Sequence, residues 1–260
     1  MIKNLTRATT AAVLTFLPLA LTTTPVAHAA STAPPAPAAV TAAETATPAT
    51  PSTALVPQAV PAVRTARAAE TLPLVIAVSR LSVALENREG YERESFRHWN
   101  AGLDPRDGCN TRAEVLIAEA VEAPAVGARC ALTGGSWWSY YDDQVVTPAG
   151  ALDIDHMVPL AEAWDSGAYA WTAARREAYA NDQGAPASLV AVTARSNRQK
   201  ADQDPADWLP PSPDALCRYL TEWTATKLRW GLSVDENEQD RLFALAVGCA
   251  DHEVTYEPAP

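Results

Sequence analysis

Apolar residues recur at helical spacing in several blocks of the chain after residue 70, and these blocks predict helices. The predicted helices cover residues 74–85, 112–122, 160–166, 171–181, 194–201, 214–230 and 234–247, with a further turn in 91–99. Thr111 is expected to cap the second of them, because Glu114 follows three residues later in a capping-box pattern. Runs rich in β-branched and aromatic residues predict strands at 130–133, 137–141, 145–147, 152–158 and 189–192. Together they predict an α+β fold, a mostly helical domain with a small β-rich insert.

The order of elements is most specific between residues 152 and 201. The strand at 152–158 carries Asp155 and His156, and Pro159 marks its end because proline cannot donate to a sheet ladder. A second strand at 189–192 and a helix at 194–201 follow. The sequence therefore predicts a strand–strand–helix (ββα) core at about 152–201.

The first 70 residues differ in composition from the rest. Lys3 and Arg7 precede an apolar stretch, and residues 27–29 read Ala-His-Ala, so residues 1–29 predict a cleaved signal peptide. A short membrane anchor is the alternative, but no stop-transfer segment follows. Residues 30–70 consist mainly of Ala, Pro and Thr and predict a disordered linker. We therefore expect one folded domain, 71–260, in a secreted, extracellular protein with no membrane attachment after cleavage.

The domain contains four cysteines, and no two of them are spaced as Cys-x-x-Cys. In an exported chain, an even number of isolated cysteines predicts two disulfides, with three possible connectivities. Cys109–Cys130 and Cys217–Cys249 are favoured, because each pair encloses one coherent block of the chain.

The formal net charge of −11 limits the functions that the chain can have. A protein held tightly on DNA neutralises phosphates with basic residues and releases counterions. An acidic protein should bind nucleic acid weakly unless basic residues gather locally, and the candidates are Arg175, Arg176, Arg195, Arg198 and Lys200. The charge argues against a tight DNA-binding protein but is compatible with an enzyme that releases its product quickly.

Two short motifs carry the candidate chemistry. Asp155 and His156 place a ligand for a hard metal ion beside a base that is largely neutral near pH 7. Asn197 and Lys200, on the following predicted helix, add a second oxygen ligand and a cation. If His156 is a general base rather than a structural histidine, the reaction rate should fall as the pH drops through about 6 to 7.

These motifs resemble the active site of the HNH (ββα-metal) nucleases. The chain from about Tyr91 onward resembles the secreted bacterial HNH endonuclease-like family, which is related to the HNH domain of some modification-dependent restriction enzymes. The resemblance implies a metal-dependent endonuclease that hydrolyses phosphodiester bonds of DNA, or of RNA, and leaves 5′-phosphate and 3′-hydroxyl ends.

The resemblance also implies roles for single residues. His156 and Asn197 would be catalytic, with His156 as the general base, and Asp155 and Asn197 would hold Mg²⁺ or Mn²⁺. Asp153 is an alternative metal ligand. Lys200 and Arg198 would bind phosphate, although a solvated helix face explains them nearly as well.

Two departures from the wider HNH pattern concern the support of the site. Thr193 and Ser196 stand where a typical member has the cysteines of a structural zinc, so no structural zinc is expected and the disulfides should replace its bracing role. Ser188 stands where the middle asparagine usually helps to orient the base, and Asn181 is a conceivable substitute.

Several alternatives stay open on the sequence alone. Arg93, Arg112, Trp99 and the cluster at 137–141 could stack nucleotides, or could pack in the core or a loop. A degenerate HNH fold kept as an exported, non-catalytic binding module is the alternative function. Nucleic acid is the expected partner, and the sequence does not reveal whether an immunity or inhibitor partner exists.

Overall fold

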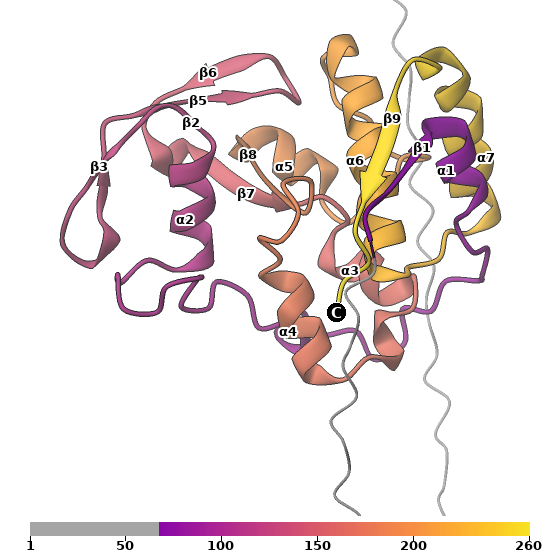
Figure 1. Ribbon diagram of the computed structural model, residues 1–260, viewed down its shortest axis with the longest axis horizontal. Coiled ribbons are helices and arrows are strands. Elements are labelled where there is room, and N and C mark those ends of the chain that lie inside the picture. Colours follow the sequence, from indigo (N-terminus) through magenta and orange to yellow (C-terminus); the bar gives the residue numbers. More distant parts are fainter. Residues whose placement is uncertain (1–67) are drawn as a thin grey trace, which may run out of the picture. The chain divides into compact units, whose positions relative to one another are not determined.

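The computed structural model describes residues 68–260, and their arrangement is drawn in Figure 1. The predicted signal peptide and nearly all of the predicted linker lie outside these residues. Glu70, assigned to the linker, is instead the first residue of a strand and forms an ion pair with Arg80. The described part contains seven α-helices and nine strands. The helices are α1 (Leu74–Ser79), α2 (Thr111–Ala118), α3 (Leu160–Asp165), α4 (Ala173–Ala180), α5 (Ala194–Lys200), α6 (Leu216–Trp230) and α7 (Glu236–Ala246).

The strands form small antiparallel sheets. They are β1 (Glu70–Pro73), β2 (Ala120–Glu122), β3 (Ala125–Val126), β4 (Leu132–Thr133), β5 (Ser136–Ser139), β6 (Gln144–Val146), β7 (Leu152–His156), β8 (Leu189–Thr193) and β9 (Glu253–Tyr256). β2, β5 and β6 make one sheet, whereas β3 pairs with β4, β7 with β8, and β1 with β9. The predicted α+β class and the β-rich insert are confirmed.

Two predicted helices differ in their bounds. The first ends at Ser79 rather than at residue 85, because the chain turns away and Val83 pairs with Val234. The second begins after Asn110, whose side chain accepts the backbone N–H of Ala113, so the cap is Asn110 and not Thr111. The side chain of Glu114 instead accepts the backbone N–H of Leu103 at 2.9 Å. The predicted turn at 91–99 is a single 3₁₀ turn, Arg93–Ser95.

The β7–β8 pair separates two hydrophobic cores. On β8, Val190 packs in the larger core, while Leu189 and Ala191 pack in the smaller one. Since side chains alternate along a strand, both faces of this pair are buried. In Figure 1 the pair lies between α2 with the β2–β5–β6 sheet and the group formed by α1, α6, α7, β1 and β9.

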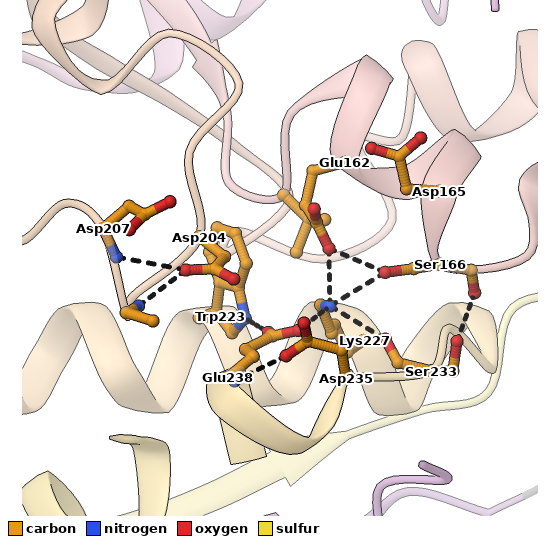
Figure 2. A network of polar contacts seen from close by, with 12 residues as sticks. Glu162, Asp165, Ser166, Asp204, Asp207, Trp223, Lys227, Ser233, Asp235 and Glu238 are labelled. Atoms are coloured by element: carbon orange, nitrogen blue, oxygen red, sulfur yellow. Dashed lines mark hydrogen bonds and ion pairs between the residues drawn. The ribbon is translucent and has the colours of Figure 1, made fainter. Parts of the chain in front are cut away.

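A buried ion network holds α3 against the two closing helices (Figure 2). The Lys227 Nζ on α6 lies 2.8 Å from Glu162 Oε1 on α3 and 2.6 Å from Glu238 Oε2 on α7. It also donates to Ser166 Oγ and to the Ser233 carbonyl. Because α3 follows β7 directly, this network fixes the segment that leaves the candidate site.

Both favoured disulfides are confirmed, Cys109–Cys130 and Cys217–Cys249. The second joins the start of α6 to the end of the α7 segment, and the first closes the block that contains α2. Of the helices in residues 68–260, none is long and apolar enough to cross a membrane.

Candidate functional site

His156 ends β7, and its side chain is buried, with 6% exposed. Its Nε2 lies 2.9 Å from the carbonyl oxygen of Ala180. A carbonyl only accepts hydrogen bonds, so Nε2 carries the proton and Nδ1 keeps the lone pair. The ring stacks on Trp99, with centroids 5.3 Å apart and planes inclined by 27°. The tautomer and plane of the imidazole are therefore fixed, and Nδ1 is the nitrogen that can accept a proton.

Asn181 holds the loop that carries Trp99. Its Oδ1 accepts the backbone N–H of Asn100 at 3.0 Å, and its Nδ2 donates to the Arg97 carbonyl at 2.8 Å. Trp99 has φ +59°, a left-handed backbone that bulky residues rarely adopt. Since Asn181 follows Ala180 directly, the carbonyl that fixes His156 and the loop that covers it are anchored together.

Asp155 and His156 point to opposite faces of β7, as neighbouring strand residues do, yet both border one cavity. The hydroxyl of the buried Tyr141 donates to Asp155 Oδ2 at 2.6 Å. The Lys200 ammonium donates to the same oxygen at 2.5 Å. Among residues 68–260, no hydrogen bond reaches Asp155 Oδ1, which leaves that oxygen to the cavity.

Lys200 does not lie where a phosphate ligand is needed, and that expectation is corrected. Its side chain is fully buried, and its Nζ donates to Asp155 Oδ2, to the His156 carbonyl at 3.0 Å and to the Met157 carbonyl at 2.8 Å. An ammonium has three protons, so all of them are used inside the protein. Lys200 therefore points from α5 toward β7 and not into solvent.

Asn197 is held from behind by Asp153. Its Nδ2 donates to Asp153 Oδ2 at 3.2 Å, so the amide oxygen is the atom left for a ligand. The Nε of Arg198 lies 3.4 Å from the same Asp153 oxygen, and the Arg198 side chain is 76% exposed. Asp153 thus orients Asn197 and Arg198 rather than lining the cavity itself.

The cavity that these residues border has a volume of about 470 Å³. Asp155 and His156 reach it from β7, and Asn197 and Arg198 reach it from α5. Arg93 completes a pair of cations at its rim. The remaining lining residues are Tyr91, Ile154, Pro159, Leu160, Ala161, Ala201 and Asp202. The His156 imidazole, two oxygen atoms without a hydrogen bond within residues 68–260 (on Asp155 and Asn197) and two exposed arginines therefore border the same cavity.

Asp142 braces the start of α5. Its Oδ2 accepts hydrogen bonds from Thr193 Oγ1 at 2.6 Å and from Ser196 Oγ at 2.9 Å. Its Oδ1 accepts one from Ser139 Oγ. The bracing expected of the disulfides is therefore provided here by hydrogen bonds to one carboxylate, at the two positions where the resemblance would place zinc cysteines.

Ser188 supports the loop before β8 and not the imidazole. Its hydroxyl donates to Asp182 Oδ2 at 2.7 Å, while Arg229 and Trp230 also donate to that carboxylate. Its carbonyl accepts the Met157 N–H at 3.0 Å. Ser188 therefore fixes the loop that follows Asn181, whereas the His156 imidazole is oriented by the Ala180 carbonyl.

The other basic and aromatic residues singled out in the sequence are mostly structural. Arg176 donates to the carbonyls of Ser95, Ala168 and Trp171. Arg175 and Arg112 also donate to carbonyls, of Trp230 and Leu152 respectively. Trp137 and Tyr141 are fully buried, although Trp138 is 47% exposed. Of the basic residues singled out in the sequence, Arg93 and Arg198 are the ones that border the cavity.

Burial determines the proton affinity of His156. It lowers the pKa of this imidazole from 6.5 to about 3, against the opposing hydrogen bond to Ala180, and His98 and Arg93 lower it further. The ring is therefore neutral throughout the physiological range. The expectation that the rate would fall at pH 6 to 7 is corrected for the free protein, since the titration lies far below that range.

We predict that this burial makes the fold sensitive to acid. Between the folded pKa of about 3 and the unfolded value near 6.5, the unfolded chain binds a proton that the folded protein does not. The stabilising contribution is complete above pH 6.5 and is lost as the pH falls, by about 1.4 kcal/mol per pH unit. Urea unfolding of the wild type and His156→Gln between pH 7 and 4 should show the stability difference shifting toward the variant by roughly 3 kcal/mol. A difference that stays constant over this range would contradict the prediction.

The family described as GmrSD restriction endonucleases, C-terminal domain, matches residues 113–245, just over half of the chain. The chain belongs to this family. It is also 40% identical over 162 residues to an "Uncharacterized secreted protein" of Arthroderma benhamiae, which covers 62% of this chain and 77% of the relative. No solved structure matches the chain.

The segment matched by the GmrSD C-terminal domain family contains the centre of the site. It runs from α2 to α7 and includes β7, β8 and α5 with Asp155, His156 and Asn197. Arg93 and Trp99 precede it, so one rim of the cavity and the ring stacked on His156 come from outside the matched segment.

The donor atoms at the cavity suit a hard divalent cation. Within residues 68–260 no three histidine, cysteine, aspartate or glutamate side chains are grouped to hold a metal ion. Mg²⁺ commonly uses only one or two protein carboxylates, keeps several waters and takes substrate phosphate oxygens. Asp155 Oδ1 and the Asn197 amide oxygen fit that requirement, because their other polar atoms are engaged elsewhere.

Proposed function

We propose that the chain is a secreted, metal-dependent HNH endonuclease that hydrolyses phosphodiester bonds of DNA, with RNA as the alternative substrate. One observation carries the proposal. His156, with Nδ1 left as proton acceptor, shares a cavity with two free oxygen donors, on Asp155 and Asn197, and with two arginines. Family membership supports the nuclease class, since the matching family is one of restriction endonuclease C-terminal domains.

In this proposal, His156 removes a proton from water. Nδ1 accepts the proton while Nε2–H stays bound to the Ala180 carbonyl, which stabilises the cation that forms. Arg93 and Arg198 are the rim cations available to hold the phosphate, in place of the buried Lys200. Asp155 and Asn197 would hold Mg²⁺ or Mn²⁺, which would stabilise the negative charge that develops on the phosphate and on the leaving 3′ oxygen.

The charge distribution supports a weakly bound substrate. The chain has a formal net charge of −11, and the cavity offers two arginines against Asp155 and Asp202. Few phosphate contacts mean little counterion release and a modest affinity. Such a protein would act by repeated encounters with nucleic acid rather than by tight retention.

An extracellular location is part of the proposal. Disulfides persist in oxidising compartments, and all four cysteines of the described chain are paired. The relative from Arthroderma benhamiae is named a secreted protein, and residues 1–29 have the composition of a signal peptide.

A plasmid-nicking assay tests this function. The oxidised protein, purified without reductant, is incubated with supercoiled plasmid, or with a labelled RNA, in the presence of Mg²⁺, Mn²⁺ or EDTA. We expect relaxed circles with either metal, none with EDTA, and 5′-phosphate at the nicks. Protein with intact disulfides that cuts neither substrate would refute the proposal, and binding of the uncut plasmid would favour the non-catalytic binding module.

A further inference from the structure

Lys200 occupies an unusual place for a lysine. Its side chain is fully buried, and the rings of Tyr141, Tyr219 and Trp223 lie 5.8 to 6.0 Å from its ammonium. A charge in such surroundings persists only when it is paired and fully hydrogen-bonded. Asp155 supplies the pair, and the carbonyls of His156 and Met157 supply the remaining acceptors.

The contacts of Lys200 join the candidate ligand to the candidate base. One proton is given to the Asp155 carboxylate, and another is given to the carbonyl of His156. Tyr141 donates to the same Asp155 oxygen, so Oδ2 is occupied twice while Oδ1 borders the cavity. The side chain of Asp155 is thus clamped with one defined oxygen facing outward.

The clamp also changes the charge that a metal ion would meet. Asp155 and Lys200 together carry no net charge. The other carboxylate at the cavity, Asp202, is paired with Arg88 at 2.7 Å, and Asp153 behind Asn197 is paired with Arg198. Each of Asp155, Asp153 and Asp202 is therefore paired with a cation, although Arg88 also pairs with Asp165, and Arg93 adds one further positive charge at the cavity.

We infer that Lys200 is a positioning residue that keeps the free site neutral, so that a divalent cation binds firmly only together with a nucleic-acid phosphate. The phosphate supplies the negative charge that the protein withholds. Metal and nucleic acid then raise each other's affinity by the same factor, as linkage requires. This inference rests on the proposed function for the identity of the second ligand, but the charge role of Lys200 is independent of cleavage.

Mn²⁺ binding by the free protein tests the charge role directly. Free Mn²⁺ is counted by electron paramagnetic resonance at pH 8 in titrations of the wild type, Lys200→Met, Lys227→Met and Tyr141→Phe. We expect Lys200→Met to bind Mn²⁺ roughly tenfold or more tightly than the wild type, because a like charge next to the ligand has been removed. Lys227→Met, titrated once circular dichroism shows that it is folded at this pH, should bind as the wild type does, since Lys227 is equally buried but pairs with Glu162 and Glu238 rather than with Asp155.

Tyr141→Phe separates charge from hydrogen bonding. It removes one bond to Asp155 Oδ2 without changing the charge, so it should not tighten Mn²⁺ binding. Unchanged or weaker Mn²⁺ binding in a folded Lys200→Met would overturn the inference, as would equal tightening in Lys227→Met.

A second measurement applies if Lys200→Met does not fold. His156→Ala, which should leave nucleic acid uncut, is titrated with Mn²⁺ in the presence and absence of a short DNA duplex. We expect Mn²⁺ to bind about tenfold or more tightly with DNA present, and this gain should vanish when Asp155→Asn is added. Equal Mn²⁺ affinity with and without bound DNA would overturn the coupling. Tighter Mn²⁺ binding by Lys200→Met in a protein that never cuts would uphold the charge role while refuting the nuclease.

Discussion

Replacing His156 with alanine should reduce cleavage by about 10²- to 10⁴-fold, the usual contribution of a positioned base. The ring is fixed by the Ala180 carbonyl and by stacking on Trp99, so another side chain cannot easily take over its place. Initial rates of plasmid nicking measure the loss. Circular dichroism and a DNA-binding assay should give near wild-type results, because the substitution removes no ion pair.

His252→Ala is the matched control, because its side chain is exposed and far along the chain in the turn before β9. It should cleave at the wild-type rate. Burial lowers the pKa of His156 to about 3, so the ring stays neutral between pH 7 and 6. The wild-type rate should therefore show no fall from protonation of His156 in that range. Activity that survives in His156→Ala would show that another residue is the base.

Local sequence patterns predicted the centre of the fold well. The alternation at Leu152–His156, the break at Pro159 and the apolar run at Leu189–Thr193 located β7 and β8 closely, because both strands are governed by short-range pattern and burial. The same holds for α5 and for the two disulfides, whose cysteines enclose coherent blocks.

Contacts between distant segments were beyond these patterns. Spacing placed Asn197 and Lys200 on one helix face, but spacing does not reveal whether that face is solvated or packed on a strand. Only the fold shows that Lys200 turns inward to Asp155 and that Tyr141 shares the same oxygen. The pairing of β1 with β9 joins residues about as far apart as the described chain allows, and no local signal marks it.

The predicted start of α2 is wrong because the side chain expected to cap the helix forms hydrogen bonds elsewhere. A capping box needs Glu114 to bond at the helix start, but this carboxylate accepts N–H groups from the loop at Leu103 instead. Asn110 then caps the helix, and the chain leaves it after Ala118 to enter β2. The competing bonds come from tertiary structure, which the sequence does not display.

Lys227→Met should lower the free energy of unfolding by about 3 to 5 kcal/mol at neutral pH, the range typical of removing one partner from a buried pair. Lys227 lies between Glu162 and Glu238, and all three side chains are almost completely buried. In the wild type, burial tends to raise the pKa of Glu162, but Lys227 outweighs it and that pKa is lowered. At Glu238, burial outweighs Lys227 and raises the pKa to about 8. Without the ammonium, two carboxylates face each other between α3 and α7. Urea unfolding monitored by tryptophan fluorescence measures the change.

The loss in Lys227→Met should grow as the pH rises. Burial raises the pKa of both carboxylates in the folded protein, and Lys227 opposes that rise. Without Lys227 we therefore expect both folded pKa values to lie above the unfolded values near 4.5. Their folded forms then stay protonated, and stability is retained below pH 4.5 and lost as the pH rises through the folded values. The gap to the wild type should therefore be smaller at pH 5 than at pH 8. Arg241→Met is the control, because this exposed α7 cation should change stability by less than about 0.5 kcal/mol. A gap independent of pH would mean that Lys227 acts through packing rather than through its charge. The ion network would then not explain how α3 is held beside the candidate site.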